Sequence, residues 1–527
     1  MIKGGPFSGI APKYATHLLP ETSAKTAKNC LMTSGELRPL KTTAFVWTPT
    51  KTGTVTTIWR YLDTYWFHWL EDVDVVASPV ANDAYDRAYW TGEAEPRMTT
   101  SAIATSGGGT NYPNNYYLLG IPAPAAVATI THGTPGSAAN IQSRAYIYTY
   151  VSAYGEEGPP SLSSALHDIT DGDSVTVGLP STGPTGQYNI THKNLYRRNG
   201  DIFQFVATIA VATTSYTDTK LNSALGDSIT SEEYDPPPST LNGLASLACG
   251  SLVGFSGNEL CVSVPYLPHA WPARYRIPII GDIVSIGSFG NSVLVTRATG
   301  KPIIFTISDP DSIYKEEAEV GQACVSKRGT VDMGVFVVYP APTGLIVVGT
   351  GAMDLITKDV IDPRDWVSYS APTTFLSAKY GDNYIFFNTV GSVSSGSIFN
   401  TKTGDLSTMD IYATAAYTDN ATGDLYLVVS GNIVKFDAGA ELTMVWESKD
   451  FILGKETNFA RGKMRASAYP AGTLAIYADA VLRHTETVAS KYAFSLPSGF
   501  LADVWSYKIT STKTIKSVSI GNSIGEL

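Results

Sequence analysis

A short hairpin pattern returns at a near-constant interval between Leu241 and Asp437, and it constrains the fold more than any other feature. Each copy holds an apolar run, a turn rich in Gly, Asn or Asp, and a second apolar run. The copies begin at Gly250, Phe289, Gly334, Tyr380 and Tyr417. Strand-built repeats of roughly 40–50 residues are typical of propeller blades, each a small antiparallel sheet. Because the side chains do not repeat letter by letter, a sandwich or barrel with evenly spaced hairpins is the alternative.

The composition is that of a turn-dense β protein. The 527 residues include 47 Gly, 30 Pro and 30 Tyr, and this length suits about three domains or one large propeller with additions. Charged residues make up 16% of the chain and aromatic residues 11%, whereas about a quarter charged is usual for a soluble domain. This balance indicates that much of the surface contacts other protein. A β-rich surface that uses Thr, Ser and Asn in place of charges would give the same balance.

Charge and hydropathy argue against two classes of partner. A protein that grips nucleic acid needs clustered Lys and Arg, but the net charge is −10 and the longest basic clusters, 196–198 and 327–328, are short. No apolar run approaches the roughly 18 residues of a membrane helix. The opening MIKGGPFSGIAPK lacks the apolar core of a secretory signal. We therefore expect synthesis in the cytosol, with no export signal and no membrane anchor.

Four scattered cysteines, Cys30, Cys249, Cys261 and Cys324, give little sign of a disulfide framework. Cys249 and Cys261 could face each other across a hairpin, which leaves one disulfide open. Reduced, buried cysteine is the commoner state in a cytosolic product. No CxxC or Cys/His spacing indicates a metal site.

The first hundred residues hold the motifs that carry a resemblance. Residues 21–29 (ETSAKTAKN) predict about two helical turns with Ala24 and Ala27 on one face, and a turn at 35–39 then leads into a strand. GPFSGIAP, LLPETSAKTAKNC and SGELRPL resemble the opening of the tail nozzle proteins (tail tubular protein B-like) of short-tailed double-stranded DNA bacteriophages. The run D-R-A-Y-W-T-G at 86–92, followed by PRMT at 96–99, is the most specific match to that family.

Two aromatic runs, 58–61 and 65–69, predict a hairpin joined across Leu62-Asp63-Thr64. Strand alternation places Tyr65, Phe67 and Trp69 on one face and Trp66 and His68 on the other. Such a cluster favours core packing between blades, although aromatic side chains can also form a sugar-binding platform.

Residues 106–122 predict a flexible connector rich in Gly and Asn, and Ala123 to Pro238 then resembles a fibronectin type III module. In 144–152, Tyr146, Tyr148 and Tyr150 alternate with Ala145, Ile147 and Val151. A strand is expected at 174–179, a hairpin at 189–210 that turns at Asn199-Gly200-Asp201, and a last strand at 215–218. This length suits one sandwich of about 100 residues. We interpret it as an insertion into the blade series.

Candidate catalytic groups are few. Three sets of neighbouring carboxylates could serve glycoside hydrolysis only if they faced each other across a cleft. They are Asp72 and Asp74; Asp168, Asp171 and Asp173; and Asp309 and Asp311. Asp at hairpin turns usually bonds the backbone, and the 168–173 stretch lacks the ligand order of a calcium loop. The seven histidines show no HExxH spacing, and no GxSxG or phosphate-binding loop occurs. We therefore predict no catalytic, cofactor-binding or metal-binding residues and no enzymatic activity.

Together these features predict an all-β fold, a six-bladed β-propeller with an inserted fibronectin type III-like sandwich and a C-terminal β region. The expected divisions are an N-terminal arm at 1–43, a first blade and connector at 44–122, the insertion at 123–238, the remaining blades at 239–442 and a C-terminal β domain at 443–527. The chain from 44 to 100 is expected to close the propeller beside the last blade. In the C-terminal domain we expect strands near 473–478, 492–496 and 505–510.

The resemblance implies a structural virion protein of the phage tail, in which identical subunits, six by analogy with the family, form a ring that is the distal channel for genome ejection. It further implies partners: the head–tail adaptor ring, tail fibres or the tail tip, and DNA that passes through the lumen without sequence-specific binding. The alternative is an extracellular carbohydrate-binding or carbohydrate-active β-propeller protein, because propellers and fibronectin modules occur there too. A secretory signal and a convergent acidic cleft would favour that alternative.

Overall fold

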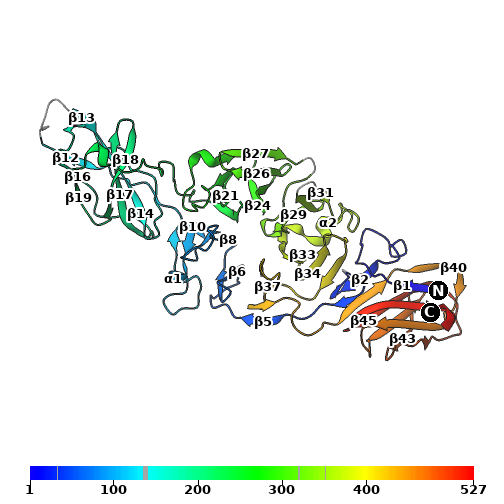
Figure 1. The fold of residues 1–527 in the computed structure, drawn as a ribbon. Helices are drawn as coiled ribbons and strands as arrows, with labels where there is room; N and C mark the ends of the chain where they lie inside the picture. The colour runs from blue at the N-terminus through cyan, green and yellow to red at the C-terminus, as the bar shows by residue number, and fades with distance from the viewer. Residues whose placement is uncertain (33, 134–140, 319–320, 350–351) are drawn as a thin grey trace. The chain divides into compact units, whose positions relative to one another are not determined.

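The computed structural model describes residues 1–32, 34–133, 141–318, 321–349 and 352–527, and strands make up most of its regular structure (Figure 1). The fold class is all-β, as the sequence predicts. Two compact units divide the chain: unit 1 holds Met1–Leu70, Leu294–Ile304 and Glu316–Leu527, and unit 2 holds Glu71–Val293 and Phe305–Lys315. The described helices are all short. They are α1 (Ser101–Ala104), α2 (Trp366–Ser370) and the 3-10 turns η1 (Asn222–Ala224), η2 (Ala273–Tyr275), η3 (Lys327–Gly329), η4 (Pro372–Thr374) and η5 (Ile524–Glu526).

Three of the five predicted hairpin copies lie in unit 1, each within an antiparallel run of four strands. The runs are β28 (Val331–Asp332), β29 (Phe336–Ala341), β30 (Gly344–Gly349) and β31 (Ala352–Leu355); β32 (Leu376–Tyr380), β33 (Asn383–Val390), β34 (Val393–Asn400) and β35 (Leu406–Met409); and β36 (Ala415–Thr418), β37 (Leu425–Val429), β38 (Asn432–Lys435) and β5 (Ala44–Trp47). The third run is completed from the far end of the chain, because β5 pairs with β38. The predicted approach of residue 44 to the last repeat is therefore confirmed for this strand.

The other two copies form the hairpins β21–β22 and β25–β26. Unit 2 contains β8 (Asp74–Ala77), β9 (Ala88–Gly92), β10 (Ala94–Thr99) and β11 (Tyr117–Leu118) in one sheet, and β20 (Asn242–Ser246), β21 (Leu252–Ser256), β22 (Glu259–Val262) and β23 (Arg276–Pro278) in another. A further four-stranded sheet has residues assigned to both units: β24 (Ile283–Phe289), β25 (Ser292–Arg297), β26 (Ile303–Asp309) and β27 (Ser312–Glu317). Part of the predicted connector is therefore a strand, since β11 pairs with β10.

Glycine makes the tight hairpin turns possible. Gly290, between β24 and β25, has φ of 61°, and Gly431, between β37 and β38, has φ of 80°. A side chain with a Cβ rarely adopts this left-handed region, whereas glycine enters it freely. No atom lies within 4 Å of a Cβ built at either position. Backbone conformation rather than crowding therefore requires glycine at these two turns.

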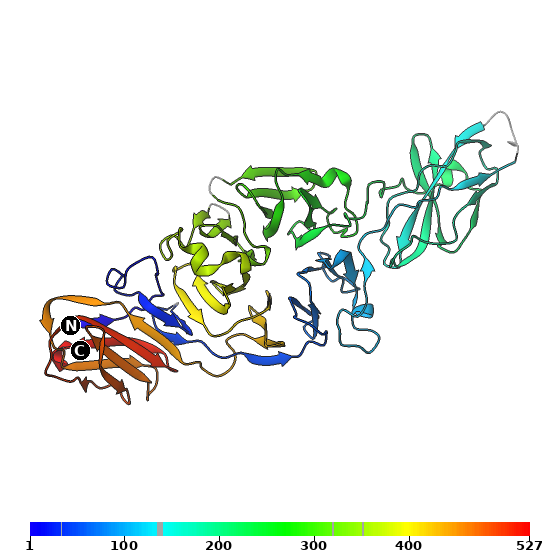
Figure 2. The ribbon, with the colours of Figure 1, turned by 180° about the vertical axis from the view of Figure 1, so that it is seen from behind.

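The N-terminal arm and the C-terminal region of unit 1 share their sheets, and both chain ends lie in this region (Figures 1 and 2). β1 pairs with β46, while β2 lies between β35 and β39. The strands of this region are β1 (Ile2–Gly4), β2 (Ala24–Lys28), β3 (Cys30–Leu31), β4 (Arg38–Pro39), β39 (Met444–Ser448), β40 (Phe451–Thr457), β41 (Arg461–Ala466), β42 (Thr473–Ala478), β43 (Val481–Thr487), β44 (Phe494–Ser495), β45 (Ala502–Ser511) and β46 (Ile515–Gly521). All three predicted C-terminal strands occur, although the one expected near 492–496 covers only two residues.

The helix predicted at 21–29 is wrong, because β2 occupies Ala24–Lys28. Ala24 and Ala27 are buried as expected, but in a strand that bonds β39. The Lys25 ammonium lies 2.9 Å from Glu447 and 2.8 Å from Asp450. A helix of nine residues is marginal in water, so pairing with a distant strand outweighs the local preference. That partner strand follows more than four hundred residues later.

The aromatic hairpin forms as predicted from β6 (Thr57–Tyr61) and β7 (Tyr65–Trp69). Trp59, Tyr61 and Trp69 have ring contacts with Phe67 on one face. On the other face the Trp66 ring centroid lies 4.8 Å from that of Tyr426 on β37. Both faces are therefore covered, and Trp66 packs the hairpin against the last repeat of unit 1, which agrees with the packing interpretation.

Residues 123–238, here called the insert, lie in sequence between the β8–β11 and β20–β23 sheets. Their strands are β12 (Thr129–Thr131), β13 (Ile141–Arg144), β14 (Tyr146–Ser152), β15 (His167–Thr170), β16 (Val175–Gly178), β17 (Ile190–Asn199), β18 (Ile202–Ala210) and β19 (Ser215–Asp218). They form the sheets β12-β16-β19, β13-β15 and β14-β17-β18 (cyan and green in Figure 2). Tyr146, Tyr148 and Tyr150 share one core with Val175 and Val177 of the facing sheet. The predicted strands and the turn after Asn199 are confirmed.

Candidate functional site

The paired carboxylates outside the insert have turn and surface roles. Asp74, the first residue of β8, accepts a hydrogen bond from the Gly243 amide at 3.1 Å, and Asp72 lies two residues before this strand. Asp309 accepts the amide of Asp311 at 2.9 Å, as expected of a turn. Asp311 in turn lies 2.8 Å from Arg274 at an exposed position. These partners give neither pair the role of a catalytic couple across a cleft, the arrangement that acid–base hydrolysis needs.

The three carboxylates of the insert go to three different partners. Asp168 accepts a hydrogen bond from Ser143 at 2.8 Å, and Asp171 forms an ion pair with the buried Arg144 at 2.5 Å. Asp173 lies 3.7 Å from His132. The calcium-loop alternative at 168–173 therefore gains no support, since Arg144 and Ser143 take its carboxylates. In the described ranges, no three His, Cys, Asp or Glu side chains form a group that could hold a metal ion.

The four cysteines are free thiols, so the structure contains no bond between Cys249 and Cys261. Burial, followed by the charge of Asp405, raises the pKa of Cys30 to about 12. Burial also raises the pKa of Cys261, to about 11. Because the thiolate is the reactive form, both groups are inert at neutral pH and act as small apolar side chains.

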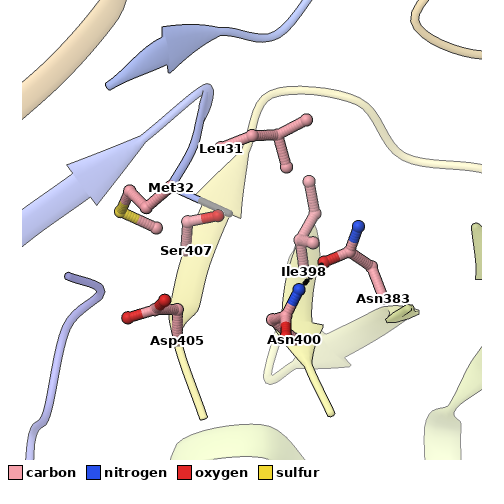
Figure 3. Close-up of a pocket in the computed structure, with 7 residues that line it drawn as sticks. All are labelled: Leu31, Met32, Asn383, Ile398, Asn400, Asp405 and Ser407. Carbon is pink, nitrogen blue, oxygen red and sulfur yellow. Dashed lines mark hydrogen bonds between the residues drawn. The ribbon is translucent and has the colours of Figure 1, made fainter. Parts of the chain in front are cut away.

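The pocket drawn in Figure 3 lies where the N-terminal arm crosses β34 and β35. The Asn400 side-chain amide donates to the Asn383 oxygen at 3.0 Å, and the Ser407 hydroxyl donates to the Cys30 carbonyl at 3.0 Å. Asp405 accepts the Gly9 amide at 2.8 Å. The remaining space is about 10 Å³, which suffices for roughly one water molecule. At this pocket the N-terminal arm packs against β34 and β35, and the space left is too small for a ligand.

Two larger hollows are open to solvent. One, of about 520 Å³, lies at the end of the insert and is lined by Gln142, Ser143, Leu166, Arg198, Asn199, Gly200 and Asn222. The other, of about 480 Å³, lies in unit 1 and is lined by Met1, Ile2, Lys3, His17, Glu21, Lys449, Asp450, Phe451, Ile452 and Leu453. Each is a surface depression with mixed polar and apolar walls. Neither gathers the predicted carboxylate sets.

A cluster of buried, mutually hydrogen-bonded charged side chains in unit 2 centres on Arg87, the arginine of the D-R-A-Y-W-T-G run. Its Nε donates to Asp83 at 2.7 Å, and its terminal nitrogen donates to Glu156 of the insert at 2.7 Å. The three side chains are 11%, 6% and 8% exposed. Burial alone would raise the pKa of Asp83, but hydrogen bonds from Arg87, Ser78 and the Tyr85 amide lower it overall. Asp83 therefore stays ionised at neutral pH. The cluster ties the insert to the segment that precedes β9.

Tyr154, two residues before Glu156, reinforces the same contact. Its ring centroid lies 4.5 Å from that of Tyr85 and 6.4 Å from that of Tyr117 on β11. Its hydroxyl lies 3.4 Å from the Thr100 hydroxyl. A Cβ added to Gly158 would come within 2.6 Å of the Ile121 side chain, so this turn requires glycine for close approach. We call this contact region, from Tyr85 and Arg87 to Tyr154 and Glu156, the junction.

His269 is buried beside the junction, at only 4% exposure. Neither ring nitrogen makes a hydrogen bond of acceptable geometry. The Tyr234 ring lies 6.1 Å away, edge to face. Burial lowers the pKa of His269, and the charge of Arg87 lowers it further. The charge of Glu156 and both the backbone and the charge of Glu157 oppose this shift. The ring is therefore neutral at pH 7, and the polar groups near it, among them the Glu157 backbone, do not bond it with good geometry. This is an expensive state for a buried imidazole.

A second buried histidine, His68 on β7, is fully satisfied instead. Nε2 accepts the Lys51 amide at 3.3 Å, and Nδ1 lies 3.2 Å from the Trp66 carbonyl, which fixes the tautomer. Burial, assisted by Lys51, lowers the pKa of His68 to about 4 despite the Trp66 carbonyl. No sequence pattern distinguishes these two histidines. Asp83, Glu156 and His269 are too far apart in sequence for any local pattern to group them.

Comparison with known proteins adds no identification. No family model and no curated protein matches the sequence. Among solved structures, the computationally designed Ika8 protein is 11% identical, with a TM-score of 0.30 over 75% of this chain and 99% of that one. BBS1N in complex with ARL6DN is 12% identical, with a TM-score of 0.28 over 75% and 96%. The Myceliophteria thermophila Cps50 (Swd1) beta-propeller domain is 9% identical, with a TM-score of 0.27 over 52% and 83%. Likenesses this distant say nothing about activity or partners.

A separate test concerns membranes. Among the described residues, none of the helices has the length and apolar character needed to cross a bilayer.

Proposed function

We propose that this chain is a tail nozzle protein of a short-tailed double-stranded DNA bacteriophage, a structural virion protein without enzymatic activity. The observation that carries the proposal is the D-R-A-Y-W-T-G run with PRMT after it, because the fold gives these residues a defined structural role. They occupy the adjacent strands β9 and β10, where Tyr89 and Trp90 are fully buried. Arg87 anchors the junction. A motif whose residues pack the core and hold two segments together suits a structural protein of a virion.

In the proposed architecture, six runs of four antiparallel strands are the blades of one six-bladed propeller. The blades are β8–β11, β20–β23, β24–β27, β28–β31, β32–β35 and β36–β38 with β5. Supporting this, β5 completes the last blade from the opposite end of the chain, the usual way for a propeller to protect its last edge. The insert is proposed to be a fibronectin type III-like module that projects from this body.

In the assembled tail, identical subunits are proposed to form a six-fold ring through head-to-tail contacts that close on themselves. One end docks on the head–tail adaptor ring, and the sides or tip carry fibres. A channel for DNA must let phosphates slide, whereas a wall of Lys and Arg would hold them by counterion release. The net charge of −10 per chain agrees with a lumen that does not grip DNA.

Immunogold labelling of intact particles tests the assignment. Antibodies raised against the purified chain should label the tail at its distal end, and labelling should vanish in particles assembled without this chain. Antibodies against a capsid shell protein serve as the matched control. Labelling of the capsid shell by antibodies against this chain would refute the nozzle role.

A further inference from the structure

We propose that the junction is an acid-releasable latch: Arg87, Glu156 and His269 hold the insert closed on its neighbouring sheet at neutral pH and release it under mild acid. The inference concerns unit 2 alone and stands or falls independently of the nozzle assignment.

The first step is that the junction is a clasp between segments far apart in sequence. The chain passes between the insert and the flanking sheets only at its two ends, near 119–123 and 235–241. Beyond these crossings, the Arg87–Glu156 ion pair and the Tyr85–Tyr154 ring contact hold the turn at 152–158 in place. Glu156 is itself oriented by Ser152, whose hydroxyl lies 3.3 Å from Oε2. Removing one partner of such a buried pair is costly, because the other charge is left without compensation.

The second step is that His269 lies beneath this clasp. Its charged neighbours are Glu156 and Glu157 of the turn and Arg87 of the facing segment, and Tyr234 of the insert's exit covers the ring. Glu157 is already engaged, since it accepts hydrogen bonds from Thr149 and Tyr196. With the latch closed, the ring is only 4% exposed, and neither of its nitrogens makes a hydrogen bond of good geometry, although the Glu157 backbone lies near it. The closed state therefore disfavours the imidazolium.

The third step fixes the sign of the pH dependence. Opening exposes His269 to water, where its pKa returns to about 6.5. The closed state, in which burial lowers the pKa, binds fewer protons below that pH. Protonation therefore favours the open state, and the open-to-closed ratio should rise by up to about tenfold per pH unit below about pH 6.5. The tenfold rise per pH unit ends at the lower pH where His269 is protonated in the closed state as well.

The test is a distance measurement between spin labels at two exposed positions of unit 2 in the full chain. Ile202→Cys lies at the hairpin turn of the insert and Ile280→Cys follows β23, with side chains 51% and 88% exposed. Cys249 is replaced by Ser, since the other three native thiols are buried. Electron paramagnetic resonance then reports the distance distribution at pH 7.5 and pH 5.5. Circular dichroism at both pH values verifies that the fold is intact.

The expected result is one narrow distribution at pH 7.5 and a second, displaced population at pH 5.5. His269→Phe, which keeps an aromatic ring but cannot titrate, should give the same distribution at both pH values. His269→Gln provides a second non-titrating variant if the Phe substitution perturbs folding. His192→Phe, at an exposed position of the insert, is the matched control and should respond to pH as the unsubstituted histidine does. Glu156→Gln should show the displaced population already at pH 7.5.

Three outcomes would overturn the latch. The distribution could be identical at pH 7.5 and pH 5.5, which removes the switch. Both non-titrating His269 variants could still open under acid, which removes His269 from it. Glu156→Gln could stay closed at pH 7.5, which removes the ion pair from the clasp.

Discussion

Two buried arginines, one inside the insert and one at its edge, each pair their charge with carboxylates, but the pairs have different structural roles. Arg197 is 0% exposed, and it donates to Asp218, to the Lys220 carbonyl and to Asn222, each at 2.8 Å. All of these partners belong to the insert. Arg87 instead divides its donors between Asp83, outside the insert, and Glu156, inside it. The first arginine stabilises the insert, whereas the second fixes where the insert rests.

The comparison explains why two similar ion pairs should fail differently. Buried pairs add little net stability over apolar residues, but loss of one partner is severe. Losing a partner of Arg197 should destabilise the fold of the insert itself, because the guanidinium left unpaired lies in its core. Tyr146 lies beside it, and its hydroxyl also bonds Asp218. Losing a partner of Arg87 should release an insert that remains folded. The two defects are thus separable by experiment.

The largest expected effect is the cooperative unfolding of the insert when it is expressed by itself. Residues 123–238 expressed alone should unfold cooperatively on heating, because the tyrosine core and the Arg197 network lie wholly within the segment. A domain of this size has a free energy of unfolding of roughly 5–15 kcal/mol. The measurement is a far-ultraviolet circular dichroism melt. A disordered spectrum at low temperature would remove the basis for separating the two arginines.

The next effect concerns the interior pair. Asp218→Ala leaves the Arg197 guanidinium buried without its carboxylate, and it should lower the free energy of unfolding of the insert by about 3–5 kcal/mol. Hydrogen exchange of peptides from β14, β17 and β18 in the full chain measures the loss. The control is Asp201→Ala, whose side chain is fully exposed beside Arg198; an exposed pair of this kind contributes only about 0–1 kcal/mol. Equal effects of the two substitutions would show that burial of the pair is immaterial.

The smallest expected effect is that of Arg87→Lys, which should weaken the junction and leave the core of the insert unchanged. Arg87→Lys keeps the positive charge but cannot serve Asp83 and Glu156 together, since a lysine ammonium lacks the planar fork. Loss of one charge-assisted hydrogen bond should cost about 1.5–3 kcal/mol of junction stability. Exchange should accelerate at 152–158 while the β17–β18 hairpin keeps its protection. Arg198→Lys, at a half-exposed site of the insert, is the matched control. Acceleration throughout the insert would place Arg87 among the residues that stabilise its fold.

The hairpins were predictable because their signals are local. Apolar runs flanking glycine turns specified all five repeat hairpins, and alternation specified the common face of Tyr146, Tyr148 and Tyr150 in the insert core. The strand β2 was missed, and a helix at 21–29 predicted in its place, for the opposite reason. There the deciding interactions are with β39 and with Glu447 and Asp450, and no window around Ala24 contains them.

The candidate site was less accessible to sequence reasoning. The D-R-A-Y-W-T-G run drew attention to Arg87, but no motif marked Glu156, its partner in the junction. Their pairing depends on tertiary structure, as does the burial of His269 without a hydrogen bond of good geometry. Carboxylate spacing pointed to Asp168, Asp171 and Asp173, which the fold distributes among Ser143, Arg144 and His132. Spacing identifies candidates for chemistry, whereas the cross-strand partners decide their roles.

Symmetry-averaged electron cryomicroscopy of intact virions that contain this chain tests the proposed function most directly. The account predicts six copies around the tail axis, at the distal end below the adaptor ring, with density for the four-stranded sheets and for the insert of each copy. The free chain can remain monomeric until the adaptor provides a template, so the virion itself is the relevant specimen. Single copies lying off the axis, or copies within the capsid shell, would contradict the nozzle assignment.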